Sequence, residues 1–124
     1  MTDTVVLIDD SPAILKLLQD ILRSDGYEIR AFSSGELALR SLTARAAALV
    51  LLDVRMPGMD GLAICRYIKA DDRLKETPVI FLSATDDPQE KVMALQAGGV
   101  DFISKPFHEE EVRARVRTHL DLHR

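Results

Sequence analysis

The chain has 124 residues, 47% of them hydrophobic, and its formal net charge of −4 argues against a nucleic-acid-binding surface, which needs clustered lysine and arginine. This length suits one compact domain, and we expect residues 1–124 to form a single domain with no second module. Cys65 is a lone cysteine, so we expect no internal disulfide. The first residues lead directly into an apolar segment, which argues against a signal peptide, and no apolar run is long enough to span a membrane. These features favour a cytoplasmic protein without membrane contact.

The first third of the chain alternates strand-like and helix-like segments. Val5–Ile8 is a short apolar run that predicts a buried strand, and Ser11-Pro12 supplies an N-cap and a first-turn proline for the helix that follows. Gly26 ends this helix, because a left-handed residue is favoured there. Tyr27–Phe32 alternates apolar and charged residues, which predicts an edge strand, and Ser33–Glu36 has capping-box spacing for a second helix.

The apolar run Ala46–Leu52 predicts a strand buried on both faces, as in a parallel sheet. Asp53 follows it directly, and Met56-Pro57-Gly58 cannot continue a strand. Position alone leaves two readings of Asp53 equally open. One is a turn aspartate that bonds to its own loop, and the other is a functional carboxylate at a strand's carboxyl end, where open α/β sheets build binding crevices. Asp60 can then cap a third helix.

The remaining segments continue the alternation. Pro78–Leu82 and Val100–Ser104 predict two more strands. Between them, Asp86-Asp87-Pro88 opens a fourth helix that Gly98-Gly99 closes. A last helix carries one apolar stripe, formed by Val112, Val116 and Leu120. Strand and helix alternate throughout, which predicts an α/β fold with a five-stranded parallel sheet covered by helices on both faces.

Polar residues follow four of the five predicted strands, and the carboxyl ends of parallel strands lie at one edge. These residues are Asp9, Asp10, Asp53, Ser83 and Lys105. Close carboxylates repel unless a cation lies between them, and an all-oxygen set suits Mg²⁺, with Mn²⁺ as an alternative ion. A lysine and a hydroxyl opposite the ion could compensate a phosphoryl group, which an aspartate can accept as an acyl phosphate. The alternative to a phosphoryl site is a structural role, in which the lysine forms an ion pair with one carboxylate and the other residues are ordinary polar residues at strand ends.

Four motifs, in this order and spacing, carry a resemblance to a known family. They are Val6–Ser11, Leu51-Leu52-Asp53 with Met56–Gly61, Leu82-Ser83-Ala84, and Ala97-Gly98 with Asp101–Phe107. Over essentially its whole length the chain resembles the receiver domain of two-component response regulators, in the chemotaxis-Y-like superfamily. The resemblance implies a doubly wound, flavodoxin-like (βα)5 fold with strand order 2-1-3-4-5, which agrees with Tyr27–Phe32 as an edge strand.

The resemblance also implies roles for individual residues. Asp53 would accept a phosphoryl group from a sensor histidine kinase or a histidine phosphotransfer protein. Asp9, Asp10, Asp53 and the backbone carbonyl of Arg55 would hold Mg²⁺. Lys105 would pair with the phosphoryl oxygens, and its bond to Pro106 is expected to be cis. The remaining positions would switch the domain or tune the phosphoryl lifetime: Ser83 and Phe102 as switch residues, Ala84 as a small residue that allows access, and Arg55 with Thr85 as tuning residues.

The implied function is that of a signalling phosphoacceptor, not an enzyme, which catalyses only its own phosphotransfer and slow dephosphorylation. Phosphorylation would shift a pre-existing equilibrium and be read on the fourth helix, the fifth strand and the last helix. The sequence does not name the cognate kinase or the output, and it leaves open a stand-alone receiver, a part of a larger protein, and a phosphorylation-linked homodimer involving Arg113–Arg117.

Three other functions share part of this pattern. A receiver that acts as a phosphorylation-independent interaction module is the main alternative, although such a domain would normally have lost an acidic residue or the lysine. A flavodoxin-type FMN binder is disfavoured because Asp9-Asp10-Ser11-Pro12 would repel a phosphate. A haloacid-dehalogenase-type phosphatase needs an Asp-x-Asp pattern after its first strand, and Ile8 is not followed by one.

Overall fold

The computed structural model describes residues 2–58 and 60–123. Met59 of the second motif, and Met1 and Arg124 at the ends of the expected domain, lie outside the described residues. The elements, in chain order, are β1 (Thr4–Ile8), α1 (Pro12–Arg23), β2 (Glu28–Phe32), α2 (Gly35–Ala44), β3 (Leu49–Asp53), α3 (Gly61–Ala70), β4 (Val79–Ser83), α4 (Pro88–Gln96), β5 (Asp101–Ser104) and α5 (Glu109–Leu122).

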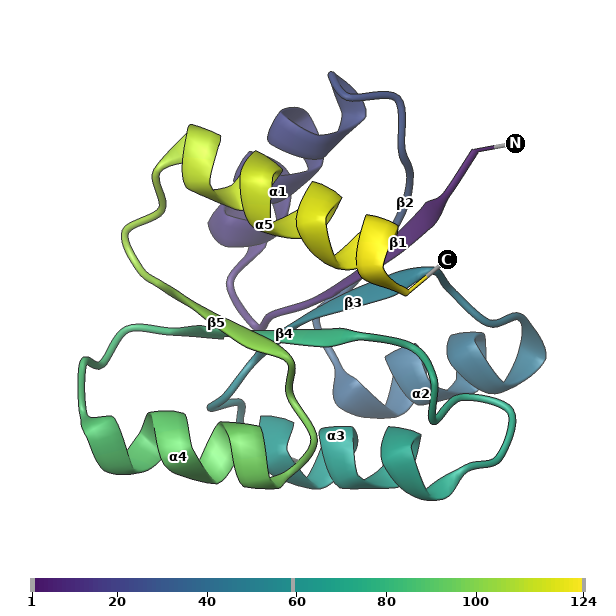
Figure 1. Cartoon of the computed structure of the whole chain (residues 1–124), viewed down its shortest axis with the longest axis vertical. Helices are drawn as coiled ribbons and strands as arrows, with labels where there is room; N and C mark the ends of the chain where they lie inside the picture. Colours follow the sequence, from purple (N-terminus) through teal and green to yellow (C-terminus); the bar gives the residue numbers. More distant parts are fainter. Residues whose placement is uncertain (1, 59, 124) are drawn as a thin grey trace.

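The five strands form one parallel sheet in the order β2-β1-β3-β4-β5. Helices α1 and α5 cover one face of this sheet, and α2, α3 and α4 cover the other (Figure 1). The flavodoxin-like α/β fold and its strand order are therefore confirmed. Within the described ranges, none of the helices combines the length and apolar character that crossing a membrane requires.

The central strand β3 begins later than the sequence predicts. Ala46 is exposed and the two alanines after it are half-buried, whereas every residue of Leu49–Asp53 is buried. Alanine has a low preference for strands and buries little surface, so these residues connect α2 to the sheet instead of extending it. The backbone N–H of Ala48 already donates to the carbonyl of Thr4 on β1, which guides the chain into register. Asp53 is thus the last residue of the strand itself.

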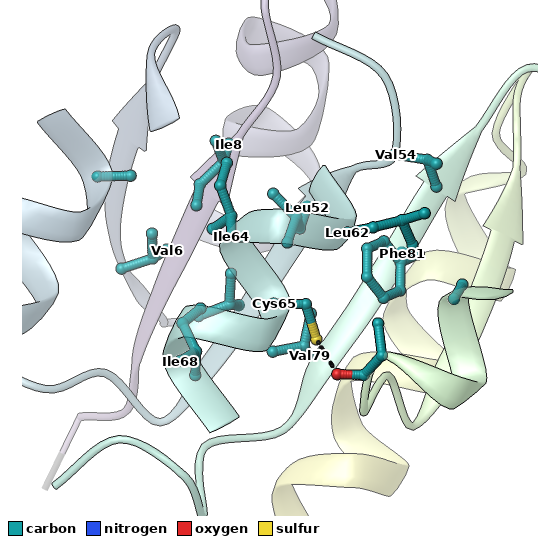
Figure 2. Close-up of a cluster of buried hydrophobic side chains, with 14 of the residues drawn as sticks. Val6, Ile8, Leu52, Val54, Leu62, Ile64, Cys65, Ile68, Val79 and Phe81 are labelled. Carbon is teal, nitrogen blue, oxygen red and sulfur yellow. Dashed lines mark hydrogen bonds between the residues drawn. The ribbon is translucent and has the colours of Figure 1, made fainter. Parts of the chain in front are cut away.

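Two apolar clusters hold the helices against the sheet. Figure 2 shows the cluster beneath α3, in which Cys65 lies beside Val79 of β4. The Cys65 thiol donates to the carbonyl of Ala97, 3.4 Å away, and burial raises the pKa of this thiol to about 11. Cys65 therefore behaves as a small buried hydrophobic residue, since its thiolate is strongly disfavoured.

Helix α4 buries fewer apolar side chains than α2 and α3, which cover the same face of the sheet. Its buried residues are Glu90 and Ala94, while the apolar side chains of Val92 and Leu95 are 51% and 54% exposed. A helix whose apolar side chains face outward while a glutamate faces the core departs from the usual amphipathic arrangement. This inverted pattern places a charged side chain beside the carboxyl edge of the sheet.

Candidate functional site

Strand register brings the predicted site residues together at the carboxyl edge of the sheet. Ile8 pairs with Leu52, so the next residues, Asp9 and Asp53, leave their neighbouring strands at the same level. On the other side Asp53 pairs with Leu82, and the β4–β5 pairing ends at Ser83 and Ser104. A cavity of about 330 Å³ opens there, lined by Asp53, Arg55, Ser83, Ala84, Thr85 and Lys105.

Three carboxylates form the acidic part of the site. One oxygen from each of Asp9, Asp10 and Asp53 lies within 4.8 Å of the others. Asp9 is fully buried, Asp53 is 6% exposed and Asp10 is exposed, so this cluster connects the interior of the sheet to solvent. A compact all-oxygen donor set that is open on one side fits Mg²⁺, which binds through a few carboxylates and keeps part of its shell for water or phosphate oxygens.

Lys105 places a positive charge against two of these carboxylates. Its Nζ lies 2.8 Å from Oδ2 of Asp9 and 3.5 Å from Oδ2 of Asp53. The other oxygen of Asp9 accepts a hydrogen bond of 2.9 Å from the backbone N–H of Ser11, at the start of α1. The Lys105–Pro106 peptide bond is cis. One ammonium thus faces two buried carboxylates, and it lies nearer to Asp9 than to Asp53.

The environment of Asp53 disfavours its ionised form. Its pKa is raised to about 6, first by burial and then by the nearby charge of Asp9. The ammonium of Lys105 and the N–H of Arg55, which donates to Oδ1 of Asp53 at 3.3 Å, oppose this shift without cancelling it. Two carboxylates beside one ammonium leave net negative charge in a buried place, which a divalent cation would compensate.

Ser83 makes a contact that sequence reasoning missed. Its hydroxyl donates to Oε1 of Glu90 at 2.7 Å and accepts from the backbone N–H of Thr85 at 3.1 Å. Glu90 also binds the guanidinium of Arg55, whose Nε and Nη2 lie 3.2 and 2.9 Å from its Oε2. The sequence carries no local signal for this contact, because an acidic residue in the first turn of a helix is favoured by the helix dipole whether or not it is buried.

Phe102 lies apart from the cavity-lining residues. It sits on β5 opposite Phe81 of β4, half-buried against the cluster beneath α3 and α4. The ammonium of Lys91 on α4 lies 5.5 Å from the centre of its ring, within the range of a cation–π contact. The predicted switch residues Ser83 and Phe102 therefore contact α4 at two separate points.

The loop that follows Asp53 is held close to the strand end. The N–H of Gly61 donates to the carbonyl of Val54 at 2.8 Å, and a Cβ added at Gly61 would overlap the backbone carbonyl oxygen of Asp53. Asp60 caps α3 by accepting from the N–H of Ala63 at 2.7 Å. Glycine is therefore required where the helix begins, because the backbone of the site passes directly over it.

Comparison with known proteins identifies relatives with the same architecture. The family model described as the response regulator receiver domain matches residues 5–117. The DNA-binding response regulator MtrA of Mycolicibacterium smegmatis is 34% identical over 120 residues, which cover 97% of this chain and 51% of that protein. The response regulator protein TodT of Pseudomonas putida is 38% identical over 118 residues, which cover 95% of this chain and 51% of that protein. The chain thus spans about half the length of these relatives.

A solved structure shows the same fold. The signal receiver domain of a signal transduction histidine kinase from Syntrophus aciditrophicus superposes with a TM-score of 0.89 at 34% identity, covering 97% of this chain and 91% of that one. Sequence and structure comparisons therefore point to the same class of domain.

Proposed function

The chain belongs to the response regulator receiver family, whose domains are signalling phosphoacceptors rather than enzymes, and on this basis we propose that Asp53 is its phosphorylated residue. The observation that carries the assignment is that Asp53, of the three clustered carboxylates, is among the residues that line the cavity beside Lys105. Asp9 is fully buried and already bound by Lys105 and Ser11, while Asp10 is exposed.

Family membership implies a histidine kinase as partner, and we propose that phosphohistidine on that kinase, or on a phosphotransfer protein, is the phosphoryl donor. A carboxylate oxygen of Asp53 would attack the phosphorus, the P–N bond would break, and its electron pair would return to the imidazole. The ammonium of Lys105, 3.5 Å from Asp53, is placed to pair with the added phosphoryl oxygens. The small side chain of Ala84 leaves the cavity wall open to the donor.

We propose that Asp9, Asp10, Asp53 and the backbone carbonyl of Arg55 hold Mg²⁺, with Mn²⁺ as an alternative ion. When bound, the ion supplies positive charge that offsets the acceptor carboxylate and the phosphoryl oxygens. The raised pKa of Asp53 supports this proposal, because an acceptor must be ionised to act as a nucleophile and this carboxyl group lacks compensating charge. Arg55 and Thr85, which line the cavity, would tune the access of water to the acyl phosphate.

The proposed output surface is formed by α4, β5 and α5. It lies next to both switch residues, since Ser83 contacts Glu90 of α4 and Phe102 belongs to β5. We propose that residues 1–124 act as one receiver domain. Its output would be the regulation of a further module or of a separate protein, or the formation of a homodimer on phosphorylation. MtrA, one of the relatives, is a DNA-binding response regulator, which makes control of DNA binding one form that the output of this chain could take.

The test is phosphorylation by a small phosphodonor such as acetyl phosphate in the presence of Mg²⁺, followed by the intact mass of the protein. We expect a gain of one phosphoryl group that is lost in Asp53→Asn and after chelation of the metal. Labelling that survives in Asp53→Asn would overturn the assignment of the acceptor. A chain that neither gains a phosphoryl group nor shows NMR shifts with beryllofluoride and Mg²⁺ would instead be the phosphorylation-independent interaction module.

A further inference from the structure

Glu90 is a buried carboxylate on α4 that the proposed phosphorylation chemistry does not use. It is 6% exposed, and its two oxygens bind different parts of the site. Oε1 accepts from the hydroxyl of Ser83 at 2.7 Å, and Oε2 accepts from the guanidinium of Arg55 at 2.9 and 3.2 Å. This glutamate is buried in the first turn of α4, and its oxygens are bound by the last residue of β4 and by a residue of the loop after β3. Buried charged groups are normally paired in this way, so the contact is a specific connection between α4 and the site.

We propose that Glu90 is a latch that holds the Ser83 hydroxyl away from Asp53 in the unphosphorylated chain and couples the phosphorylation site to helix α4. This inference rests on the proposed function, because it concerns how the same site changes state. Glu90 is a positioning residue in this scheme, since it acts through Ser83 and Arg55 and does not touch the acceptor.

The Ser83 hydroxyl has a single proton. A serine hydroxyl can donate one hydrogen bond, and that proton is committed to Glu90. The lone pairs of the same oxygen accept from the N–H of Thr85, which fixes the direction of the hydroxyl. To donate to a phosphoryl oxygen on Asp53, Ser83 must first leave Glu90. Each phosphorylation event therefore breaks a charge-assisted hydrogen bond before it makes one.

Arg55 adds a second competition of the same kind. Its side chain is 80% exposed and only its guanidinium tip is held by Glu90, so it can turn toward added negative charge at the mouth of the cavity. Once Ser83 and Arg55 both turn to the phosphoryl group, Glu90 would be left as a buried carboxylate without its two partners. Such a charge is costly, so the first turn of α4 must shift or release Glu90 to water. This links the chemical state of Asp53 to the position of the helix.

Beryllofluoride binding with Mg²⁺ measures the latch, because the complex mimics the phosphoryl group and its affinity reports the cost of breaking the Ser83–Glu90 bond. Glu90→Met keeps a long side chain of similar volume but removes the acceptor. We expect it to bind beryllofluoride about tenfold more tightly than the parent chain, since a hydrogen bond to a charged group no longer has to be broken. Glu90→Gln, which keeps a neutral acceptor, should fall between the two, and the exposed Glu110→Gln should match the parent.

The decisive readout is a double-mutant cycle with Ser83→Ala. If Glu90 acts through the Ser83 hydroxyl, Glu90→Met loses most of its effect on beryllofluoride affinity in the Ser83→Ala background. A merely structural effect of the substitution would persist there. In the parent chain, the side-chain carboxyl ¹³C signal of Glu90 should also shift when beryllofluoride binds, and this shift should shrink in Ser83→Ala.

The outcomes separate this inference from the proposed function. If the parent chain does not bind beryllofluoride with Mg²⁺, the proposed function fails and the latch fails with it. If the parent binds but both Glu90 variants bind with the parent's affinity or more weakly, the latch alone is overturned. If Glu90→Met does not fold, Glu90→Gln and the carboxyl signal of Glu90 still decide between a latch and a simple structural contact.

Discussion

The buried carboxylates of the site should make the metal-free chain less stable than it would be with one of them neutralised. Asp53→Asn removes the negative charge and keeps the shape of the side chain. The pKa of Asp53 is raised from 3.8 to about 6, and each unit corresponds to about 1.4 kcal/mol, so ionised Asp53 opposes folding by about 3 kcal/mol. We expect Asp53→Asn to increase the free energy of unfolding by about this amount at pH 7.5 without metal.

The pH dependence follows from the direction of the shift. Between pH 3.8 and about 6 the folded state holds the Asp53 proton more tightly than the unfolded state does, so this group lowers stability as the pH rises through that window. Above about pH 6 the penalty is fully present, and below pH 3.8 it is absent. The stability difference between Asp53→Asn and the parent chain should therefore widen from pH 4.5 to pH 7.5.

The assay is urea unfolding followed by far-UV circular dichroism, with chelator present and then with Mg²⁺. Mg²⁺ should stabilise the parent chain far more than Asp53→Asn and so narrow the gap at pH 7.5, because the ion binds the native site that Asp53 helps to form. Asp72→Asn is the matched control, since that side chain is 94% exposed and its removal should change little. An Asp53→Asn variant that is no more stable than the parent at pH 7.5, or whose gain does not vary with pH, would refute the reasoning.

Three further substitutions test the charge of the site and the packing of the fold that supports it. Lys105→Met should lower the free energy of unfolding without metal by about 3 kcal/mol, because Asp9 and Asp53 lose their shared ammonium. Added Mg²⁺ should then stabilise this variant more than it stabilises the parent chain. An unchanged urea midpoint would contradict this expectation. Gly61→Ala should lower Tm by about 10 °C or more in calorimetry, since its Cβ would overlap the Asp53 carbonyl oxygen, and a Tm equal to the parent's would show that the loop yields freely. Phe81→Ala should cost about 4 kcal/mol in urea unfolding, because a fully buried ring leaves a cavity, and a loss below about 1 kcal/mol would mean that the core closes over it.

Much of the fold and the membership of the acidic site follow from local features of the sequence. Apolar runs, a capping serine at Ser11 and a glycine with positive φ at Gly26 mark where strands and helices begin and end. The alternation of strand and helix then requires a parallel sheet, and a parallel sheet places Asp9 and Asp53 at the same edge. These features are readable because each depends on residues that are close together along the chain.

Tertiary structure alone decided how the site residues share their partners. Lys105 lies closer to Asp9 than to Asp53, and Ser83 is bound to Glu90, although Glu90 reads in the sequence as one more charged residue of a helix. The start of β3 at Leu49 was also decided by packing, since the preceding alanines are apolar but do not enter the sheet. Contacts of this kind depend on how α4 and the loops settle on the sheet, a geometry that no local pattern encodes. The sequence therefore predicts the edge of the sheet on which the site forms. The hydrogen bonds that hold the site residues in one arrangement are set by packing across the fold.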